Sequence, residues 1–219
     1  MKILIPIAIV GLLAIQSCNN NKTGTDTSKS TDTTAMTNGM GKMDDAAMKN
    51  MDNPMMASMM TSMQKMNAVK MTGDFDAEYA EMMIPHHQGA IDMANLQLSK
   101  GTDEVLKKIS RGIIQSQNAE INQFKTFLAS HKESKIEGNH PELMEAMAGM
   151  DAKMGAAPLS GNVDKDFAVL MKIHHQGAVE MSQGLLGDGT DANLKKMATA
   201  IIAAQNKEIA EFSAWLASN

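Results

Sequence analysis

Apolar residues recur at spacings of three and four along two long stretches of the chain, which is the pattern that one face of an α-helix produces. The first stretch carries Tyr79, Met83 and Met93 in phase, and the second carries Ile113 and Phe124. A Gly-Thr-Asp step at 101–103 separates them, where glycine stops one helix and Thr or Asp caps the next. So short a link makes the two helices antiparallel. Since no stretch shows the alternation of a strand, the pattern predicts an all-α protein.

The helical pattern occurs twice, at an offset of 88 residues. Residues 76–131 align with 164–219 without a gap, and 26 of these 56 pairs are identical. The second copy repeats the Gly-Thr-Asp step at 189–191. Two hairpins, each with one apolar face, bury those faces against each other. The sequence therefore predicts a four-helix bundle made of two duplicated antiparallel helical hairpins.

A methionine-rich segment precedes each hairpin. Residues 36–71 hold 12 methionines, and Val69 is the only Leu, Ile, Val or Phe among them. Spacings of three and four predict a helical lead-in with its sulfurs on one side, and Asn53 with Pro54 fits its start. Such a face either ligates metal or binds a protein partner, because methionine also serves promiscuous recognition. The candidate ligands in the two segments are Met55, Met59, Met63 and Met66, and Met144, Met147, Met150 and Met154.

The pentapeptide His-His-Gln-Gly-Ala lies in the first helix of both hairpins, at 86–90 and 174–178. With the hairpin turning near 101–102, His86 faces Gln117, and Glu120 lies one turn away. His87 lies about 100° further round the helix, beside Met83. We expect His86 to be structural or to support a ligand, and His87 to be the solvent-accessible ligand. The second copy repeats the arrangement with His174, His175, Met171, Gln205 and Glu208.

These polar residues lie on or beside a stripe that should be core, where an unpaired carboxylate is costly. They form either a satisfied polar network that fixes the register of the bundle, or a metal site. In a metal site, Gln117, Glu120, Gln205 and Glu208 would orient the ligating imidazoles. Imidazole with thioether is a soft, neutral donor set that suits Cu(I). Met82, Met93 and Met181 extend the candidate ligands on these helices, although a methionine stripe is more often plain core.

The N-terminal residues predict export. Residues 1–17 place one lysine ahead of an apolar run from 3 to 15, as in a secretory signal, and the run is too short to span a membrane. Cys18, the only cysteine, follows Ile-Gln-Ser and resembles the lipobox of bacterial lipoproteins. That resemblance implies cleavage before Cys18, acylation, and anchoring to a membrane of the cell envelope, facing the periplasm or the exterior. Loss of Lys2 leaves 19 of the 20 basic residues against 25 acidic ones, so nucleic acid is not an expected partner.

The chain therefore divides into six predicted segments. They are a lipoprotein signal peptide at 1–17, a flexible polar tether at 18–37, a Met-rich segment at 38–72, the first hairpin at 73–131, a linker with the second Met-rich segment at 132–160, and the second hairpin at 161–219.

The run Met-Ile-Pro-His-His-Gln-Gly-Ala-Ile-Asp-Met-Ala at 83–94, with Gln117-x-x-Glu120-Ile121 and Phe-Leu at 127–128, resembles the domain-of-unknown-function family numbered 305. The resemblance covers both repeats, roughly 74–219. It implies a ferritin-like four-helix fold. Because copper-binding proteins of the CopM type belong to the family, it also implies copper binding in metal tolerance, with the His and Met residues above as candidate ligands.

Three classes of function follow from these observations. We expect a lipid-anchored Cu(I) buffer or chaperone that also takes Ag(I). A structural or protein-interaction bundle without metal is the alternative. A ferritin-like di-iron oxidase needs two Glu-x-x-His pairs, whereas the chain offers only Glu137 with His140, flanked by Gly138 and Pro141 in an expected loop. The sequence thus predicts a binding protein and no enzyme, with His131 and His140 solvated.

Overall fold

The computed structural model describes residues 50, 52–132 and 140–219. Within these ranges the chain forms helices and no strand, which confirms the all-α prediction. The signal peptide, Cys18, the tether and Glu137 lie outside the described residues. The helices are α2 (Pro54–Asn67), α3 (Phe75–Lys100), α4 (Glu104–Ser130), α5 (Pro141–Gly155), α6 (Val163–Asp188) and α7 (Ala192–Ser218).

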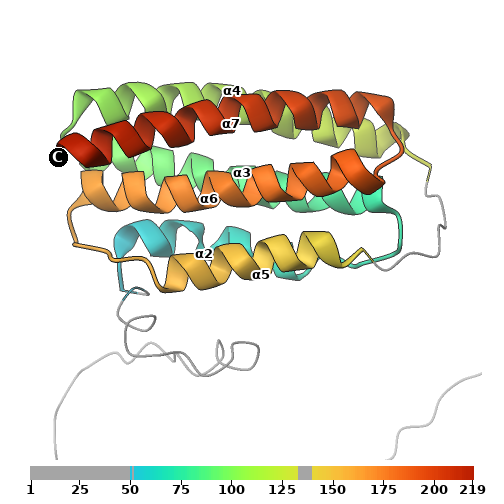
Figure 1. Cartoon of the computed structure of the whole chain (residues 1–219), viewed down its shortest axis with the longest axis horizontal. Helices are drawn as coiled ribbons and strands as arrows, with labels where there is room; N and C mark the ends of the chain where they lie inside the picture. The colour runs from blue at the N-terminus through green and yellow to red at the C-terminus, as the bar shows by residue number, and fades with distance from the viewer. Residues whose placement is uncertain (1–49, 51, 133–139) are drawn as a thin grey trace, which may run out of the picture. The chain divides into compact units, whose positions relative to one another are not determined.

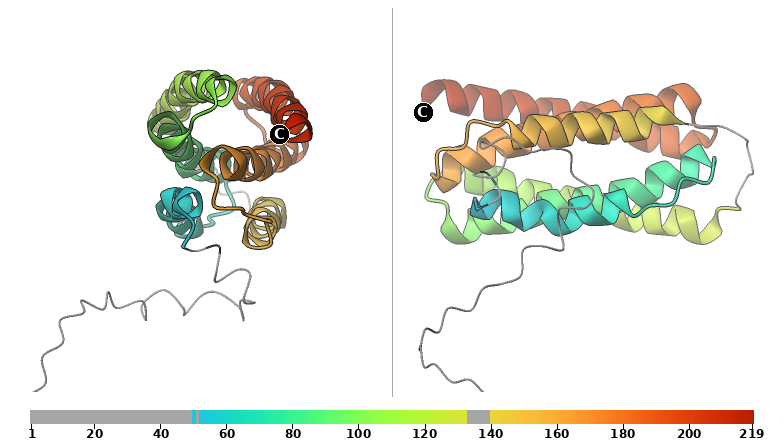
Figure 2. Two further views of the ribbon diagram at one scale, coloured as in Figure 1. Left: turned by 90° about the vertical axis from the view of Figure 1, so that its left-hand side faces the viewer. Right: turned by 90° about the horizontal axis from the view of Figure 1, so that it is seen from below.

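The two predicted hairpins, α3–α4 and α6–α7, pack together as a four-helix bundle (Figure 1). α3 and α6 form the contact between the hairpins, and they run antiparallel, since Tyr79 meets Ser182 while Gln97 meets Asp164. The Met-rich helix α2 packs on α3 and also reaches α6, and α5 packs on α6. In the end-on view of Figure 2, α2 and α5 lie side by side below the α3–α6 layer. α3 therefore has packing neighbours in α4, α6 and α2.

The Met-rich helices form as predicted and face inward. The Asn53 side chain caps α2 by accepting hydrogen bonds from the N–H groups of Met55 and Met56, and Pro54 occupies the first turn. The sulfur-bearing face is buried against the bundle, so within the described helices it is not a free surface for a partner. Met63 is half-buried and Met144 is 39% exposed, whereas the other candidate ligands here are buried core residues: Met55, Met59, Met66, Met147, Met150 and Met154.

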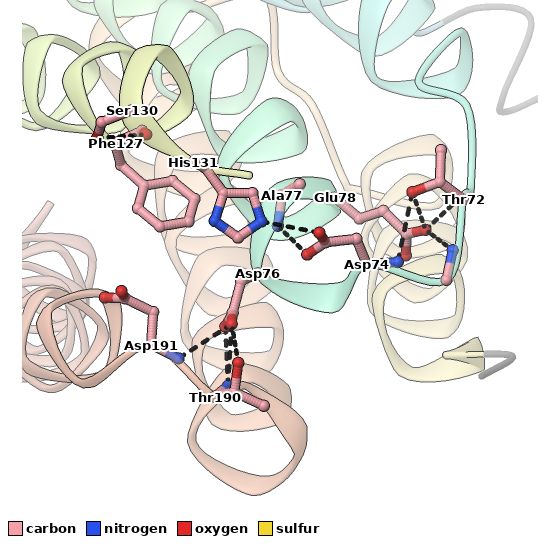
Figure 3. Close-up of polar contacts among 11 residues, drawn as sticks. Thr72, Asp74, Asp76, Ala77, Glu78, Phe127, Ser130, His131, Thr190 and Asp191 are labelled. Atoms are coloured by element: carbon pink, nitrogen blue, oxygen red, sulfur yellow. Dashed lines mark hydrogen bonds and ion pairs between the residues drawn. The ribbon is translucent and has the colours of Figure 1, made fainter. Parts of the chain in front are cut away.

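Each hairpin caps a helix of the other. The Asp164 carboxylate, at the start of α6, accepts hydrogen bonds from the N–H of Thr102 (3.0 Å) and of Asp103 (3.2 Å), just ahead of α4. Its counterpart Asp76 does the same for Thr190 (3.0 Å) and the residue after it, ahead of α7 (Figure 3). These N–H groups precede or begin a helix and have no partner within it. The glycine of each Gly-Thr-Asp step ends one helix and the aspartate caps the next, as predicted. The hydrogen bonds to Asp164 and Asp76 also join the two repeats.

A second pair of carboxylates fixes the turn from each Met-rich helix into the bundle. Gly73 and Gly161 have positive φ angles of 89° and 82°, which glycine adopts readily. Glu78 accepts a hydrogen bond from the N–H of Gly73 (2.6 Å), and Asp166 accepts one from that of Gly161 (2.8 Å).

Within the described ranges, none of the helices combines the length and apolar composition that crossing a bilayer requires.

Replacing either reciprocal cap, by Asp164→Ala or Asp76→Ala, should lower the free energy of unfolding by about 2 kcal/mol, because partly buried N–H groups lose a charged acceptor. Urea unfolding at pH 7 measures the loss, and Asp188→Ala, at an exposed position, is the control. Burial opposes the charged form of Asp164, but hydrogen bonds from Thr102 and Gln97 outweigh it and hold its pKa below the usual value. The contribution of Asp164 should thus persist above about pH 4 and vanish as the pH falls through its native pKa. A loss no larger than that of Asp188→Ala would contradict the capping role.

Candidate metal centre

Four imidazoles converge in the core where the two repeats meet. His86 and His87 come from α3, His174 and His175 come from α6, and all four are fully buried. The rings of His86 and His174 lie against each other across the α3–α6 contact, with centroids 3.7 Å apart. Each of these rings lies 6.0 to 6.2 Å from the second histidine of its own pair. The two pentapeptides therefore form one cluster instead of two separate dyads.

A glutamate from the second helix of each hairpin reaches the outer histidine. Oε2 of Glu120 lies 2.8 Å from Nε2 of His87, and Oε2 of Glu208 lies 2.7 Å from Nε2 of His175. Neither approach has the alignment of a hydrogen bond, and all eight ring nitrogens of the cluster are buried without a hydrogen-bond partner. The two carboxylates are about one-fifth exposed. They are thus placed to orient the rings, as carboxylates do for ligating imidazoles.

The expected roles of the two histidines are wrong in two respects. His86 was expected to face Gln117 with Glu120 one turn away, whereas its ring stacks on His174 and Glu120 contacts His87. His87 was expected to be accessible and is fully buried. The reason is that α3 packs against three neighbours. A 100° step round α3 therefore leads from the contact with α6 to the contact with α4, and not to solvent. Gln117 and Gln205 are buried as expected, at 2% exposure, and both have side-chain atoms without a hydrogen-bond partner.

The ring nitrogens bear on both interpretations of the polar cluster. Leaving a buried polar group unpaired costs about 1–3 kcal/mol, and a network that served only packing would pair its members. Burial, reinforced by the neighbouring imidazoles, holds the pKa values of His86 and His174 well below the usual value. These rings are therefore neutral, and each has a lone pair on one nitrogen that meets no donor. Neutral imidazole is the form that ligates metal ions, so the geometry is compatible with a metal site, which stays a prediction beside the polar network.

The glycine of each pentapeptide lies in close contact with a neighbouring helix. A Cβ at Gly177 would lie 2.9 Å from Sδ of Met150, so α5 passes directly over the turn that carries His174 and His175. A Cβ at Gly89 would lie 3.3 Å from Nε2 of His174. Glycine thus allows a close contact at both positions. The candidate methionines of α3 and α6 are all fully buried: Met82, Met83, Met93, Met171 and Met181.

Two further polar residues near the cluster were not predicted. The Tyr79 hydroxyl lies 2.8 Å from Oγ of Ser182 across the α3–α6 contact, and burial raises the pKa of Tyr79 despite that bond. Asp151 follows Met150 on α5, has a buried Oδ1 without a partner, and has its pKa raised to about 6 by burial. Tyr79 aligns with Phe167 in the second repeat. The duplication therefore does not single out the tyrosine. Asp151 was detectable, because it lies four residues after Met147 and three before Met154, on the face that carries the methionines.

The two histidines expected to be solvated are half-buried instead. Nε2 of His131 lies 2.8 Å from Oδ2 of Asp74, which joins the end of α4 to the start of α3 (Figure 3). The His140 ring packs edge-on against Phe75, with centroids 4.7 Å apart, and its ligand atom lies within 4.8 Å of carboxylate oxygens of Glu142 and Asp188. Both side chains therefore tie helix ends together, which isolated loop histidines would not do.

Comparison with known proteins identifies the family. The model of the DUF305 family, described as a domain of unknown function, matches residues 15–128 and again 76–216. The chain belongs to the DUF305 family. No curated protein matches it.

Solved structures similar to this DUF305 chain include CopM with silver bound, obtained by soaking, which is 32% identical and superposes with a TM-score of 0.52 over 65% of this chain and 95% of that one. CopM in its Cu(I)-bound form is also 32% identical, with a TM-score of 0.50 over 65% and 96%. A DUF305 fragment from Deinococcus radiodurans is 22% identical, with a TM-score of 0.51 over 66% and 97%, and it supports the fold alone. The predicted family and helical fold are thereby confirmed.

The metal-free protein should lose stability as the pH falls from 8 to 5. His86 and His174 stay neutral in the fold, whereas the unfolded chain takes up their protons near pH 6.5. Their depressed native pKa values thus favour unfolding below that pH, at up to about 1.4 kcal/mol per pH unit for each histidine. Urea unfolding of chelator-treated protein measures the slope. The double variant His86→Leu/His174→Leu should flatten it, and an unchanged slope would contradict the assignment.

Proposed function

We propose that this chain is an exported, lipid-anchored copper-binding protein that buffers or passes on Cu(I), and also takes Ag(I), in metal tolerance. The observation that carries the proposal is the cluster of four buried imidazoles, two of them beside a glutamate, in a core rich in buried methionine. Neutral imidazole and thioether together suit a soft monovalent cation. The proposed role is binding, and no catalytic step is part of it.

The proposed ligand set draws on both repeats. His86 and His174 face each other from different repeats, so a cation held by both would link the two hairpins. His87 and His175 would add nitrogens oriented by Glu120 and Glu208. Thioethers such as that of Met150, over Gly177, complete a soft donor set. Binding would offset the cost of the unpaired nitrogens, so it should stabilise the folded state strongly.

The likeness to CopM supports the choice of metal. CopM structures have been solved with Cu(I), Cu(II) and silver bound, and they are 32–33% identical to this chain over 65% of its length. The remaining chain includes the lipobox-like sequence before Cys18, on which the proposed membrane anchor rests. Thioether ligands suit an oxidising compartment outside the cytoplasm, because they form no disulfides, although oxidation to sulfoxide would disable them.

A structural or partner-binding bundle is less well supported. The methionine faces of α2 and α5, which would have to meet a partner, are buried in the core of the chain itself. A core built only for packing would also gain by replacing buried, unpaired imidazoles with apolar side chains. Both features favour the metal-binding function over the alternative.

Anaerobic titration with Cu(I) against a competing chelator tests the function. We expect tight binding by residues 18–219 carrying Cys18→Ser, which removes the competing thiol. Replacing all four core histidines by alanine should abolish the tightest binding while methionine sites retain weaker binding. His131→Ala/His140→Ala is the matched control and should bind as tightly as the parent.

The same samples should show a rise in melting temperature with Cu(I), because a ligand of the folded state stabilises it by mass action. Circular dichroism establishes that the fourfold variant is folded. Tight binding that survives in a folded fourfold variant would place the site elsewhere. No binding by the parent chain would remove the function.

Cys18→Ala should release the protein from the membrane, because it removes the thiol that receives the lipid. We expect the unmodified chain in the membrane fraction of a bacterial host and the variant in the soluble exported fraction, followed by immunoblot. Metabolic labelling with a fatty acid provides an independent readout. Equal membrane association of both forms would contradict the anchor.

A further inference from the structure

The buried cluster needs a path by which a cation reaches it. All four core histidines have no exposed surface. The side chains that touch both an imidazole of the cluster and solvent are Glu120 and Glu208, at 19% and 20% exposure. A cation that arrives from solvent and passes either contact therefore meets a carboxylate before it meets a nitrogen.

Two cavities lie between α4 and α7, and they differ in what they reach. One, of about 620 Å³, is lined by the last turns of α4, including Phe127, and the first turns of α7, including Leu194. The other, of about 850 Å³, is lined by the first turns of α4 and the last turns of α7, and Glu208 is in its wall. Glu120, the counterpart of Glu208, lines neither cavity. The larger cavity thus ends at a residue 2.7 Å from the His175 ring.

The cavity wall holds both signs of charge, with Lys108 and Lys207 among its carboxylates, and Glu208 is the carboxylate that contacts an imidazole of the cluster. Asp103 is engaged as the cap of α4, where it accepts a hydrogen bond from the N–H of Leu106 at 2.9 Å. Glu211 pairs with Lys207 at 3.7 Å. Glu208 instead contacts the His175 ring, with Oε2 2.7 Å from Nε2, so the carboxylate can attract a cation and deliver it inward.

We propose that cations reach the buried histidines through this α4–α7 cavity, with Glu208 as their first protein ligand and His175 as the next. The inference rests on the proposed function and adds its route of uptake. A carboxylate is a hard donor that holds Cu(I) or Ag(I) more weakly than imidazole or thioether does. The exchange from Glu208 to His175 is therefore downhill, and the carboxylate does not trap the ion. The second repeat is loaded from solvent, and the first receives its ion across the His86–His174 contact.

The only tryptophan of the chain, Trp215, lines the same cavity and reports on passage through it. Stopped-flow mixing of the Cys18→Ser chain with Ag(I), in chloride-free buffer and without the competing thiol, should give a quenching phase whose rate rises with the Ag(I) concentration. Ag(I) is used because it mimics Cu(I) without redox chemistry. Glu208→Gln, which removes the charge and preserves the shape, should slow that phase at least about tenfold.

Two matched variants separate the route from other effects. Glu120→Gln alters the same contact in the other repeat, away from these two cavities, so it carries any effect of ring orientation and should slow uptake less than Glu208→Gln does. Glu211→Gln removes a charge from the same cavity without touching a histidine, and it should leave the uptake rate within about twofold of the parent. In Glu208→Gln, the equilibrium affinity for Ag(I), measured by competition, should change less than the uptake rate. If the two glutamates only oriented their imidazoles, Glu208→Gln and Glu120→Gln would instead lower the affinity equally.

A steric variant keeps Glu208 in place. Ala204 lines the cavity and is exposed, and Ser116 is its counterpart in the first repeat. Ala204→Phe should slow uptake without changing affinity, whereas Ser116→Phe should not. Equal rates for Glu208→Gln and the parent, or equal slowing by Glu120→Gln, would overturn the route while metal binding persists. No Ag(I) binding by the Cys18→Ser chain would instead overturn the proposed function, and the route with it.

Discussion

The contact between His86 and His174 is the constraint on which the rest of the structure depends. The centroids of the two rings lie 3.7 Å apart, and neither residue has exposed surface. The two histidines occupy equivalent positions in the two repeats. Two protonated rings at this distance would repel strongly in a medium of low dielectric. The repeats can therefore associate closely only while both imidazoles are neutral, which is also the state in which they offer lone pairs to a cation. Association of the hairpins and readiness to bind metal are thus one property.

The remainder of the fold holds this costly contact in place. The reciprocal caps of Asp76 and Asp164 fix the register of α3 against α6 from both ends, because each carboxylate satisfies N–H groups of the opposite hairpin. The Met-rich helices then bury an apolar face over the α3–α6 layer. At about 25 cal/mol per Å² of apolar surface removed from water, these helices supply free energy that offsets unpaired nitrogens. Methionine suits the task because its flexible side chain fills irregular space and presents sulfur to the same core.

Spacing and capping residues were enough to predict the helices, the hairpins and the start of α2 at Pro54. They were not enough to orient the histidines. Hairpin geometry relates α3 to α4 alone, whereas the orientation of His86 depends on α6, to which no local pattern refers. The duplication held a usable signal, since two equivalent hairpins packed about a two-fold axis bring a residue near that axis against its own copy. The packing of whole helix faces decides which residue lies near the axis. Pro85 lies inside α3 and the helix continues past it, although proline disfavours a helix interior. Packing therefore overrides this local preference.

What the two repeats share and what they do not also bears on function. Both retain the histidine pair, the glycine, the facing glutamate and the phenylalanine that packs on the outer ring, Phe124 or Phe212. They differ at Tyr79, which is phenylalanine in the second copy, and around the α4–α7 cavities, where Trp215 replaces the phenylalanine of the first. Because the copies are joined in one chain, each side can change without changing the other, which a symmetric dimer of identical hairpins does not allow. A shared imidazole core can thus stay symmetric while its surroundings give the ion one preferred side from which to arrive.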